Sequence, residues 1–184
     1  MTIPWASLRT ILARVQKPGR YTGGEYGIVT KDPSGLLRVA ISYPDLYEIG
    51  MSNLSVRLIY RLLNKLEEVY CERVFAPGLD FEAELRARGL PLCSLETGTP
   101  LSRFDILGFS VGYELTFTNL LNILDLGGIH LFCRERGQEG PVVIAGGPAV
   151  TNPIPFGAFV DAVFLGEIEG EGIEVFRELA ARKR

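Results

Sequence analysis

Three polar segments of the chain combine glycines with hydroxyl, carboxyl or amide side chains, the groups that proteins use to hold a small molecule. They are "PDLYEIGMSN" over residues 44–53, "SVGYELTFTN" over 110–119 and "AGGPAVTNP" over 145–153. Glycine lets a ligand approach the backbone, and the free N–H groups at a helix start attract anions. The candidate ligand-binding residues in these segments are Asp45, Tyr47, Gly50, Ser52, Asn53, Ser110, Gly112, Tyr113, Glu114, Gly146, Gly147 and Pro148.

The elements that must position these segments are apolar strands alternating with helices. Strands are predicted over 37–43, 70–77, 104–112, 140–148 and 162–167, and helices over 54–66, 80–89, 118–128 and 171–184. This alternation predicts an α/β fold of three layers, with a mostly parallel sheet of the flavodoxin-like or Rossmann-like type. Ligands of such sheets bind beyond the carboxyl ends of the strands, where the three segments and "LGEIEGEG" over 165–172 are expected to gather.

Upstream of the sheet, the chain is expected to form a helix over residues 4–15 and an antiparallel hairpin over 25–43. The hairpin turn is "KDPSG", whose Asp, Pro, Ser and Gly are typical turn residues. Its first strand would add one antiparallel edge to the sheet. We therefore divide the chain into an N-terminal helix and edge strand over 1–35 and an α/β domain over 36–184.

Several of the candidate residues also have purely structural interpretations, which the sequence leaves open. Ser52 and Asn53 can cap the helix that follows them, and Asp45 after Pro44 can form a turn. Two glycines after a strand can simply permit close packing of a helix. Glu167, Glu169 and Glu171 alternate with glycine in a way that suits the start of the last helix.

Several function classes lack their motifs in this sequence. It contains neither G-x-G-x-x-G nor G-x-x-x-x-G-K-[ST], and its three cysteines and single histidine, His130, are scattered. We therefore predict no catalytic residue and no metal ligand in this chain. The net charge of −3 gives no indication of nucleic-acid binding. No run of about 18 apolar residues and no signal-peptide pattern is present, so we expect no membrane association and a cytoplasmic location.

The three segments resemble the motifs of cobalamin-binding domains of the methionine synthase and mutase type. Those domains carry D-x-H-x-x-G after a strand, S-x-L after a later strand and G-G after the next. Here Asp45 and Gly50 are in register with Tyr47 at the His position, Ser110 and Gly112 stand for S-x-L with Gly in place of Leu, and Gly146-Gly147 matches G-G.

The sequence around these segments is similar to the N-terminal region of a bacterial family of cobalamin-domain radical S-adenosylmethionine (SAM) proteins. The distinctive phrases include "YPDLYEIGMSNLSVRLIYRLLN", "FDILGFSVGYELTFTNLLNILDLGGI" and "VIAGGPAVTNPIPFGAFVDAVFLGEIEGE", within a resemblance that spans residues 20–180. The resemblance implies a C-terminal radical SAM barrel in the same polypeptide. That barrel would bind S-adenosylmethionine and carry a 4Fe-4S cluster on C-x-x-x-C-x-x-C, a motif that this chain lacks.

Tyr47 sets this chain apart from the motif, in which the His ligates cobalt and the Asp orients the His. A phenol has a pKa of about 10, so only about one in a thousand is ionised at neutral pH. The resemblance therefore implies cobalamin binding without His ligation, with Asp45, Gly50, Ser110, Gly146 and Gly147 along the nucleotide-tail groove and Tyr47 facing the corrin.

Two other functions remain open on the sequence alone. The domain can be a degenerate, non-catalytic scaffold that no longer binds cobalamin and docks through its N-terminal helix, with Trp5, Leu8, Ile11 and Leu12. It can also be a flavodoxin-like domain for flavin mononucleotide. That function calls for a loop rich in Ser and Thr after the first strand, where only Ser52 is present.

Overall fold

The computed structural model describes residues 5–137 and 140–183, without the side chains of 5–7 and 183. Five strands form one parallel sheet: β1 (Leu37–Leu46), β2 (Val69–Ala76), β3 (Ile106–Ser110), β4 (Val142–Gly146) and β5 (Ala162–Phe164). The strand order is β2-β1-β3-β4-β5, and each adjacent pair runs parallel. This is the flavodoxin-like order, so the predicted α/β class and its mainly parallel sheet are confirmed.

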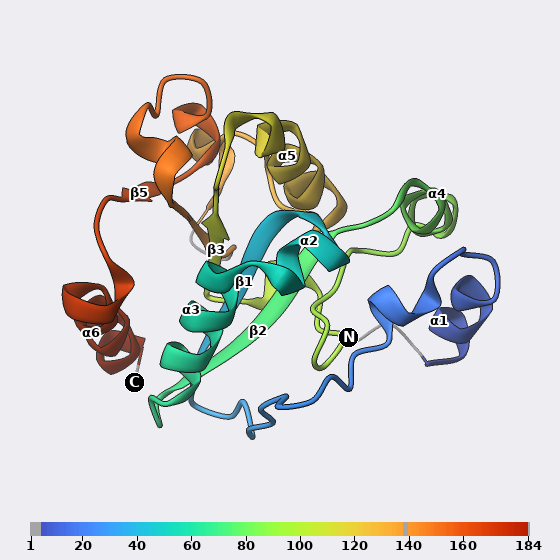
Figure 1. The fold of residues 1–184 in the computed structure, drawn as a ribbon, viewed down its shortest axis with the longest axis horizontal. Coiled ribbons are helices and arrows are strands. Elements are labelled where there is room, and N and C mark those ends of the chain that lie inside the picture. Colours follow the sequence, from blue (N-terminus) through green and yellow to red (C-terminus); the bar gives the residue numbers. More distant parts are fainter. Residues whose placement is uncertain (1–4, 138–139, 184) are drawn as a thin grey trace.

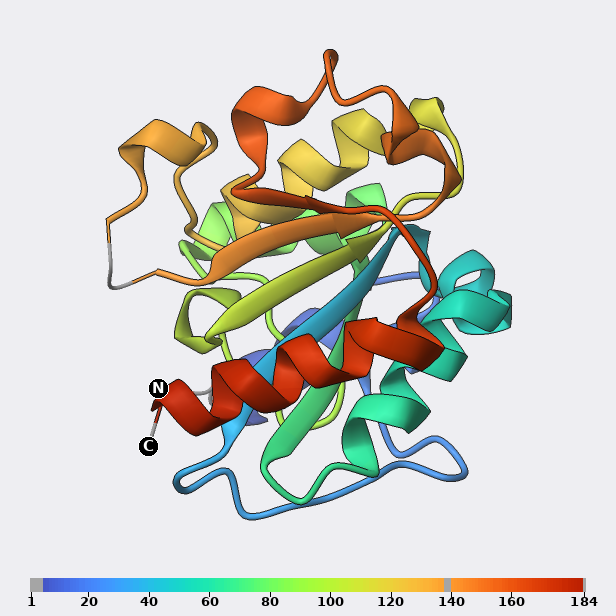
Figure 2. The same ribbon diagram turned by 90° about the vertical axis from the view of Figure 1, so that its left-hand side faces the viewer.

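Helices cover both faces of the sheet. They are α1 (Trp5–Leu12), α2 (Tyr47–Ser52), α3 (Leu54–Asn64), α4 (Leu79–Arg88), α5 (Phe117–Leu126) and α6 (Ile173–Lys183). α3 and α6 pack side by side against one face of the sheet. α5 lies on the other face, and α4 and α1 follow it on that same face (Figures 1 and 2). The alternation of apolar strand and helix thus produces the three expected layers.

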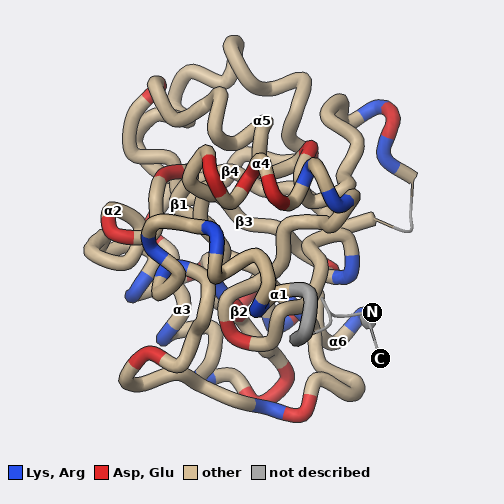
Figure 3. The backbone as a smooth tube through the Cα atoms, turned by 90° about the vertical axis from the view of Figure 1, so that its right-hand side faces the viewer, with Lys and Arg blue, Asp and Glu red and all other residues tan. Residues whose placement is uncertain are grey.

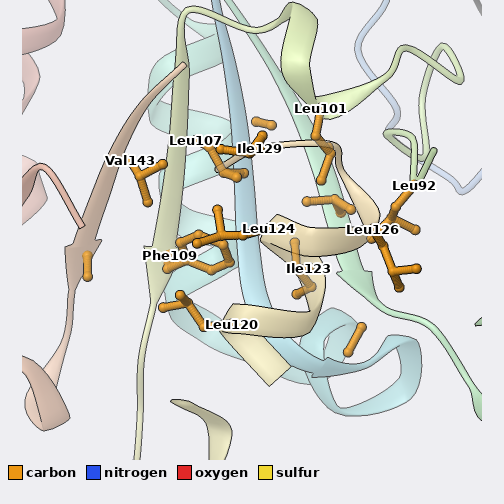
Figure 4. Packing of buried hydrophobic residues seen from close by; sticks show 14 of the residues in the cluster. Leu92, Leu101, Leu107, Phe109, Leu120, Ile123, Leu124, Leu126, Ile129 and Val143 are labelled. Carbon is orange, nitrogen blue, oxygen red and sulfur yellow. The ribbon is translucent and has the colours of Figure 1, made fainter. Parts of the chain in front are cut away.

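The two faces of the sheet bury separate apolar cores. In the first core, Leu120, Ile123 and Leu124 of α5 pack against Leu107 and Phe109 of β3 (Figure 4). In the second, β1 packs against α3 through side chains that include Val39 and Val56. Each fully buried aliphatic side chain contributes about 1.5–3 kcal/mol to folding, which fixes the helices against the strands.

The prediction of an antiparallel edge hairpin is wrong. Both edges of β1 are already occupied, by β2 and by β3, so no edge remains for a hairpin partner. Gly24 and Gly27 have φ values of 81° and 80°, which interrupt an extended strand. The backbone N–H of Val29 donates to the Tyr60 hydroxyl at 2.8 Å, so this segment covers α3 instead of pairing with the sheet.

The N-terminal helix is shorter than predicted and packs on its own domain. α1 ends at Leu12, and residue 4 and the Trp5 side chain lie outside the described part of the chain. Ile11 is fully buried in the α5 core, and Leu8 and Leu12 pack partly against it. These three side chains therefore contribute to the core of the chain's own fold.

Candidate functional site

A cavity of about 540 Å³ lies between α3 and α6, above the ends of the middle strands. The chain leaves β1 toward β2 on one side and returns to β3 on the other, so β1 and β3 flank the topological switch point. Tyr43 of β1, Ser110 of β3 and Gly146 of β4 contribute to its lining. We call this cavity the groove. Apolar side chains of the two helices complete it, among them Leu58, Ile59, Val175 and Phe176.

Five of the residues singled out in the sequence line the groove: Ser110, Gly112, Gly146, Gly147 and Pro148. Gly147 has φ of 107°, and a Cβ there would lie 2.6 Å from the carbonyl oxygen of Val111. Only glycine fits this position. A Cβ on Gly146 would find its nearest neighbour, in Phe164, at an ordinary 3.6 Å. Position 147 therefore requires glycine for its backbone conformation, whereas position 146 has room for a side chain.

The Asp45–Gly50 segment turns away from the groove. The register of β1 against β2 shifts between Tyr43 and Leu46, which places a bulge at Pro44 and Asp45. The Asp45 carboxylate accepts hydrogen bonds from the Tyr113 hydroxyl and from the Leu46 N–H, both at 2.7 Å. Asp45 therefore fixes the rim of the sheet and is not among the groove's lining residues.

Tyr47 and Gly50 pack against the edge strand β2. The Tyr47 hydroxyl donates to Glu25 at 3.1 Å, and its ring meets Phe75 edge-on at 5.8 Å between centroids. A Cβ on Gly50 would collide with the same Phe75 ring, so this glycine serves packing. The phenol at the His position of the motif is thus engaged at β2 and is not among the groove's lining residues.

The other predicted residues have structural or rim positions. Asn53 caps α3 by accepting from the Ser55 N–H at 2.9 Å, and the Ser52 hydroxyl donates to the Ile49 carbonyl at 2.9 Å. Tyr113 and Glu114 are exposed at the rim above β3, and neither lines the groove.

Tyr43 and Ser55 are among the groove residues that the sequence reasoning missed. Tyr43 is only 6% exposed, and no hydrogen bond joins its hydroxyl to another described residue. Ser55 Oγ lies 2.6 Å from Ser110 Oγ and 2.5 Å from Asn53 Oδ1. The period-2 pattern of β1 puts Tyr43 on the same face as Val39 and Ile41, so the sequence held a signal for it. Ser55 reaches the groove only because α3 docks there.

The groove is apolar and lacks basic groups. None of its described lining residues is Lys, Arg or His, whereas Glu167 and Glu169 lie at its mouth. Burial, helped by the nearby Asp45 carboxylate, raises the pKa of Tyr43, so its hydroxyl keeps its proton at neutral pH. The described part of the chain contains no group of three or more His, Cys, Asp or Glu side chains placed to hold a metal ion.

A second polar region, the edge cluster, covers the outer edge of β2. It consists of Arg38, Glu72, Arg73, Ser94, Glu96 and Thr97. The Glu72 carboxylate is 0% exposed and accepts from Arg38 at 2.7 Å, from Ser94 at 2.7 Å and from Thr97 at 2.6 Å. These bonds hold the loop over residues 94–97 against the strand.

The same loop pairs with the backbone of β2, which lies at the edge of the sheet. The Glu96 carboxylate accepts from the backbone N–H and the Nε of Arg73, both at 2.6 Å, and the Leu95 N–H donates to the Arg73 carbonyl at 2.8 Å. These contacts block the pairing of another strand. Burial raises the pKa of Glu96 to about 7, against the opposing attraction of Arg73.

A smaller cavity of about 380 Å³ adjoins this loop, with Tyr47 and Glu96 among its lining residues. Those two polar groups are already paired, with Glu25 and Arg73. Lys and Arg are interspersed with Asp and Glu on the side of the molecule that carries α1 and α4 (Figure 3). This side therefore presents no single-sign field that would attract a charged ligand.

Comparison with known proteins identifies the family. The family model for the N-terminal region of radical SAM proteins matches residues 55–184, more than half of the chain. The chain belongs to this family. The match in this radical SAM N-terminal domain includes Ser55, Ser110 and Gly146 of the groove and begins after the Asp45–Gly50 segment.

An uncharacterised protein of Methanocaldococcus jannaschii is 26% identical to the radical SAM N-terminal domain over 137 residues. The aligned region covers 73% of this chain and 25% of that protein, so the chain spans about a quarter of its relative's length. No helix within the described residues is both long enough and apolar enough to cross a membrane.

Proposed function

We propose that this chain is the cobalamin-binding-type domain of a radical SAM enzyme, and that its groove holds the nucleotide tail of a corrinoid. The observation that carries the proposal is the groove itself, which opens at the switch point and is bordered by Ser110 and by Gly146-Gly147. These are the two motif segments that resemble cobalamin-binding domains. A cavity of about 540 Å³ suits a drug-sized organic group, since such sites measure about 300–1,000 Å³.

The residues present fit a corrinoid that is held by its tail and not by a protein ligand to cobalt. Tyr47 is bound to Glu25 and packed on Phe75, and it does not line the groove. His130 follows α5, where Arg136 binds its carbonyl at 2.8 Å and also pairs with Asp161, which precedes β5. His130 therefore lies at the opposite end of the strands. A bound corrinoid supplies methyl-transfer chemistry, and this chain supplies position and exclusion of water.

The family match supports a radical SAM catalytic region in the same polypeptide, which would bind S-adenosylmethionine and a 4Fe-4S cluster. The rim that surrounds the groove suits such a neighbour. Exposed apolar side chains follow each strand: Ile49, Leu79, Leu115, Ile154 and Leu165. Apolar side chains on the ligand side of every strand favour coverage of this rim by another domain.

The same rim supports the second candidate function, a scaffold that docks the catalytic region without binding cobalamin. The two functions differ in whether the groove takes a ligand. Titration of the purified chain with hydroxocobalamin, followed by visible absorption and heat, separates them. No binding at about 100 μM, a free energy weaker than about −5.5 kcal/mol, favours the scaffold. The titration is then repeated with the polypeptide that contains the catalytic region, since that region would cover the corrin.

A further inference from the structure

Each hydroxyl group that lines the groove, except that of Tyr43, donates its proton in a hydrogen bond within the chain. Asn53 Oδ1 can only accept, so the single Ser55 hydroxyl proton points to it, across 2.5 Å. The 2.6 Å contact between Ser55 and Ser110 must then use the proton of Ser110. The Thr151 hydroxyl donates to the Pro148 carbonyl at 3.1 Å. Tyr43 thus offers the free hydroxyl donor among the described groove residues, and Ser110 offers only acceptor lone pairs.

The Tyr43 hydroxyl occupies space that Gly112 leaves open. A Cβ built on Gly112 would lie 2.6 Å from the Tyr43 hydroxyl oxygen and 3.4 Å from the nearest ring carbons. A side chain at position 112 therefore requires the Tyr43 hydroxyl to shift. Residue 112 is the place where the resembling motif has Leu and this chain has Gly. The glycine at position 112 thus leaves room for the phenol at position 43.

The interior of the groove has, among the described residues, no positively charged side chain that could hold an anionic group, so it suits the uncharged ring of a ligand and leaves any phosphate of a nucleotide tail outside. Its described lining contains no Lys, Arg or His, and Glu167 and Glu169 stand at the mouth. A phosphate or carboxylate placed inside would be desolvated without a counter-charge. Gly108 and Gly146 present no side chain on the floor, and Leu58 and Phe176 wall the sides, so a flat apolar ring can lie against them.

From this geometry we infer that Tyr43 is a ligand-binding residue, whose hydroxyl donates to an acceptor atom of a flat, uncharged heteroaromatic group in the groove. The inference deepens the proposed function, because it names the ligand chemistry of the same groove. Its donor and shape requirements hold for any such ring, whether or not the ring belongs to a corrinoid.

The direct test compares benzimidazole with indene, its nitrogen-free analogue, and with benzoate, by ligand-observed NMR and calorimetry at pH 8. We expect benzimidazole to bind about fivefold more tightly than indene, the value of one ordinary hydrogen bond, and benzoate not to bind. Tyr43→Phe should reduce benzimidazole to the affinity of indene and leave indene unchanged. Tyr60→Phe is the matched control, since its buried phenol bonds Val29 outside the groove lining.

The inference is overturned if Tyr43→Phe binds benzimidazole as tightly as the unmodified chain, if benzoate competes, or if neither ring binds. Hydroxocobalamin and cobinamide, which lacks the nucleotide tail, separate this result from the proposed function. Tyr43-dependent benzimidazole binding without any corrinoid binding rejects the proposed function alone. Corrinoid binding that is identical in the Tyr43→Phe variant rejects the role of Tyr43 alone.

A second pair of variants tests the coupling of positions 43 and 112 without any ligand. Gly112→Ala should lower the melting temperature by several degrees, because its Cβ meets the Tyr43 hydroxyl. Tyr43→Phe in the same chain should restore most of that loss, since the remaining ring contacts of 3.4 Å are tolerable. Losses that simply add would contradict the arrangement.

Discussion

The groove and the edge cluster lie on one sheet, but their polar side chains are used in opposite ways. In the edge cluster, every carboxylate oxygen of Glu72 and Glu96 accepts a hydrogen bond from the chain itself. In the groove, the Tyr43 hydroxyl has no described partner, and the cavity beside it stays open. Buried groups that are fully paired hold a fold together, whereas an unpaired donor beside a cavity is available to a ligand.

The two regions also show that resemblance to a motif does not by itself place a residue in the groove. Asp45, Tyr47 and Gly50 form the most motif-like segment, yet they serve the rim and the β2 side of the sheet. Tyr43, which belongs to no motif, faces the open cavity.

The largest effect on stability is expected from Glu72→Ala in the edge cluster. The change leaves Arg38, Ser94 and Thr97 without their buried acceptor, and breaking such a pair costs about 3–5 kcal/mol. Urea unfolding measures the loss. Glu174→Ala, which breaks an exposed pair with Arg177, should cost less than about 0.5 kcal/mol. Equal effects of the two variants would mean that the edge cluster does not hold the loop.

The next effect distinguishes the two adjacent glycines of the groove. Gly147→Ala should cost about 1–3 kcal/mol or more, because its φ is 107° and its Cβ would meet the Val111 carbonyl. Gly146→Ala should change the unfolding free energy by less than about 0.5 kcal/mol, because the nearest neighbour of its Cβ lies at 3.6 Å. Thermal and urea unfolding compare the pair. An unchanged unfolding free energy in Gly147→Ala would contradict the positive φ and the close approach to Val111 at this position.

A smaller, pH-dependent effect is expected at Glu96. Its pKa is raised by burial from 4.5 to about 7, so the folded chain binds a proton that the unfolded chain has lost between these values. The unfolding free energy should therefore fall as pH rises from about 5 to 7, by at most about 1.4 kcal/mol per unit. Glu48 does not interfere, because its pKa is lowered to about 2, so its contribution is lost only below about pH 4.5.

The Glu96→Gln variant provides the comparison, since its side chain cannot take up a proton. Its unfolding free energy should be nearly independent of pH between 5 and 7. A slope that survives in this variant would assign the pH dependence to another group.

The sequence predicted the strands, helices and layers well, because period-2 and helical patterns are local. It could not predict that β1 has β2 and β3 on its two edges, which is why the hairpin failed. The bulge at Pro44 and Asp45 redirects the motif segment, and a bulge depends on the partner strand's register. Tyr43 could be found from the alternation of β1, but Ser55 and the Glu72 and Glu96 pairings arise only when distant segments meet.

The groove between α3 and α6 is proposed to bind the tail of a corrinoid. The most direct test of this proposal is a calorimetric titration of the Gly146→Leu variant with hydroxocobalamin, beside the unmodified chain and Glu174→Ala. A side chain at Gly146 fills the groove without a backbone collision. We expect micromolar binding by the unmodified chain and by Glu174→Ala, and at least a tenfold loss, about 1.4 kcal/mol, in Gly146→Leu with its fold intact. Equal binding by all three chains would contradict the proposal.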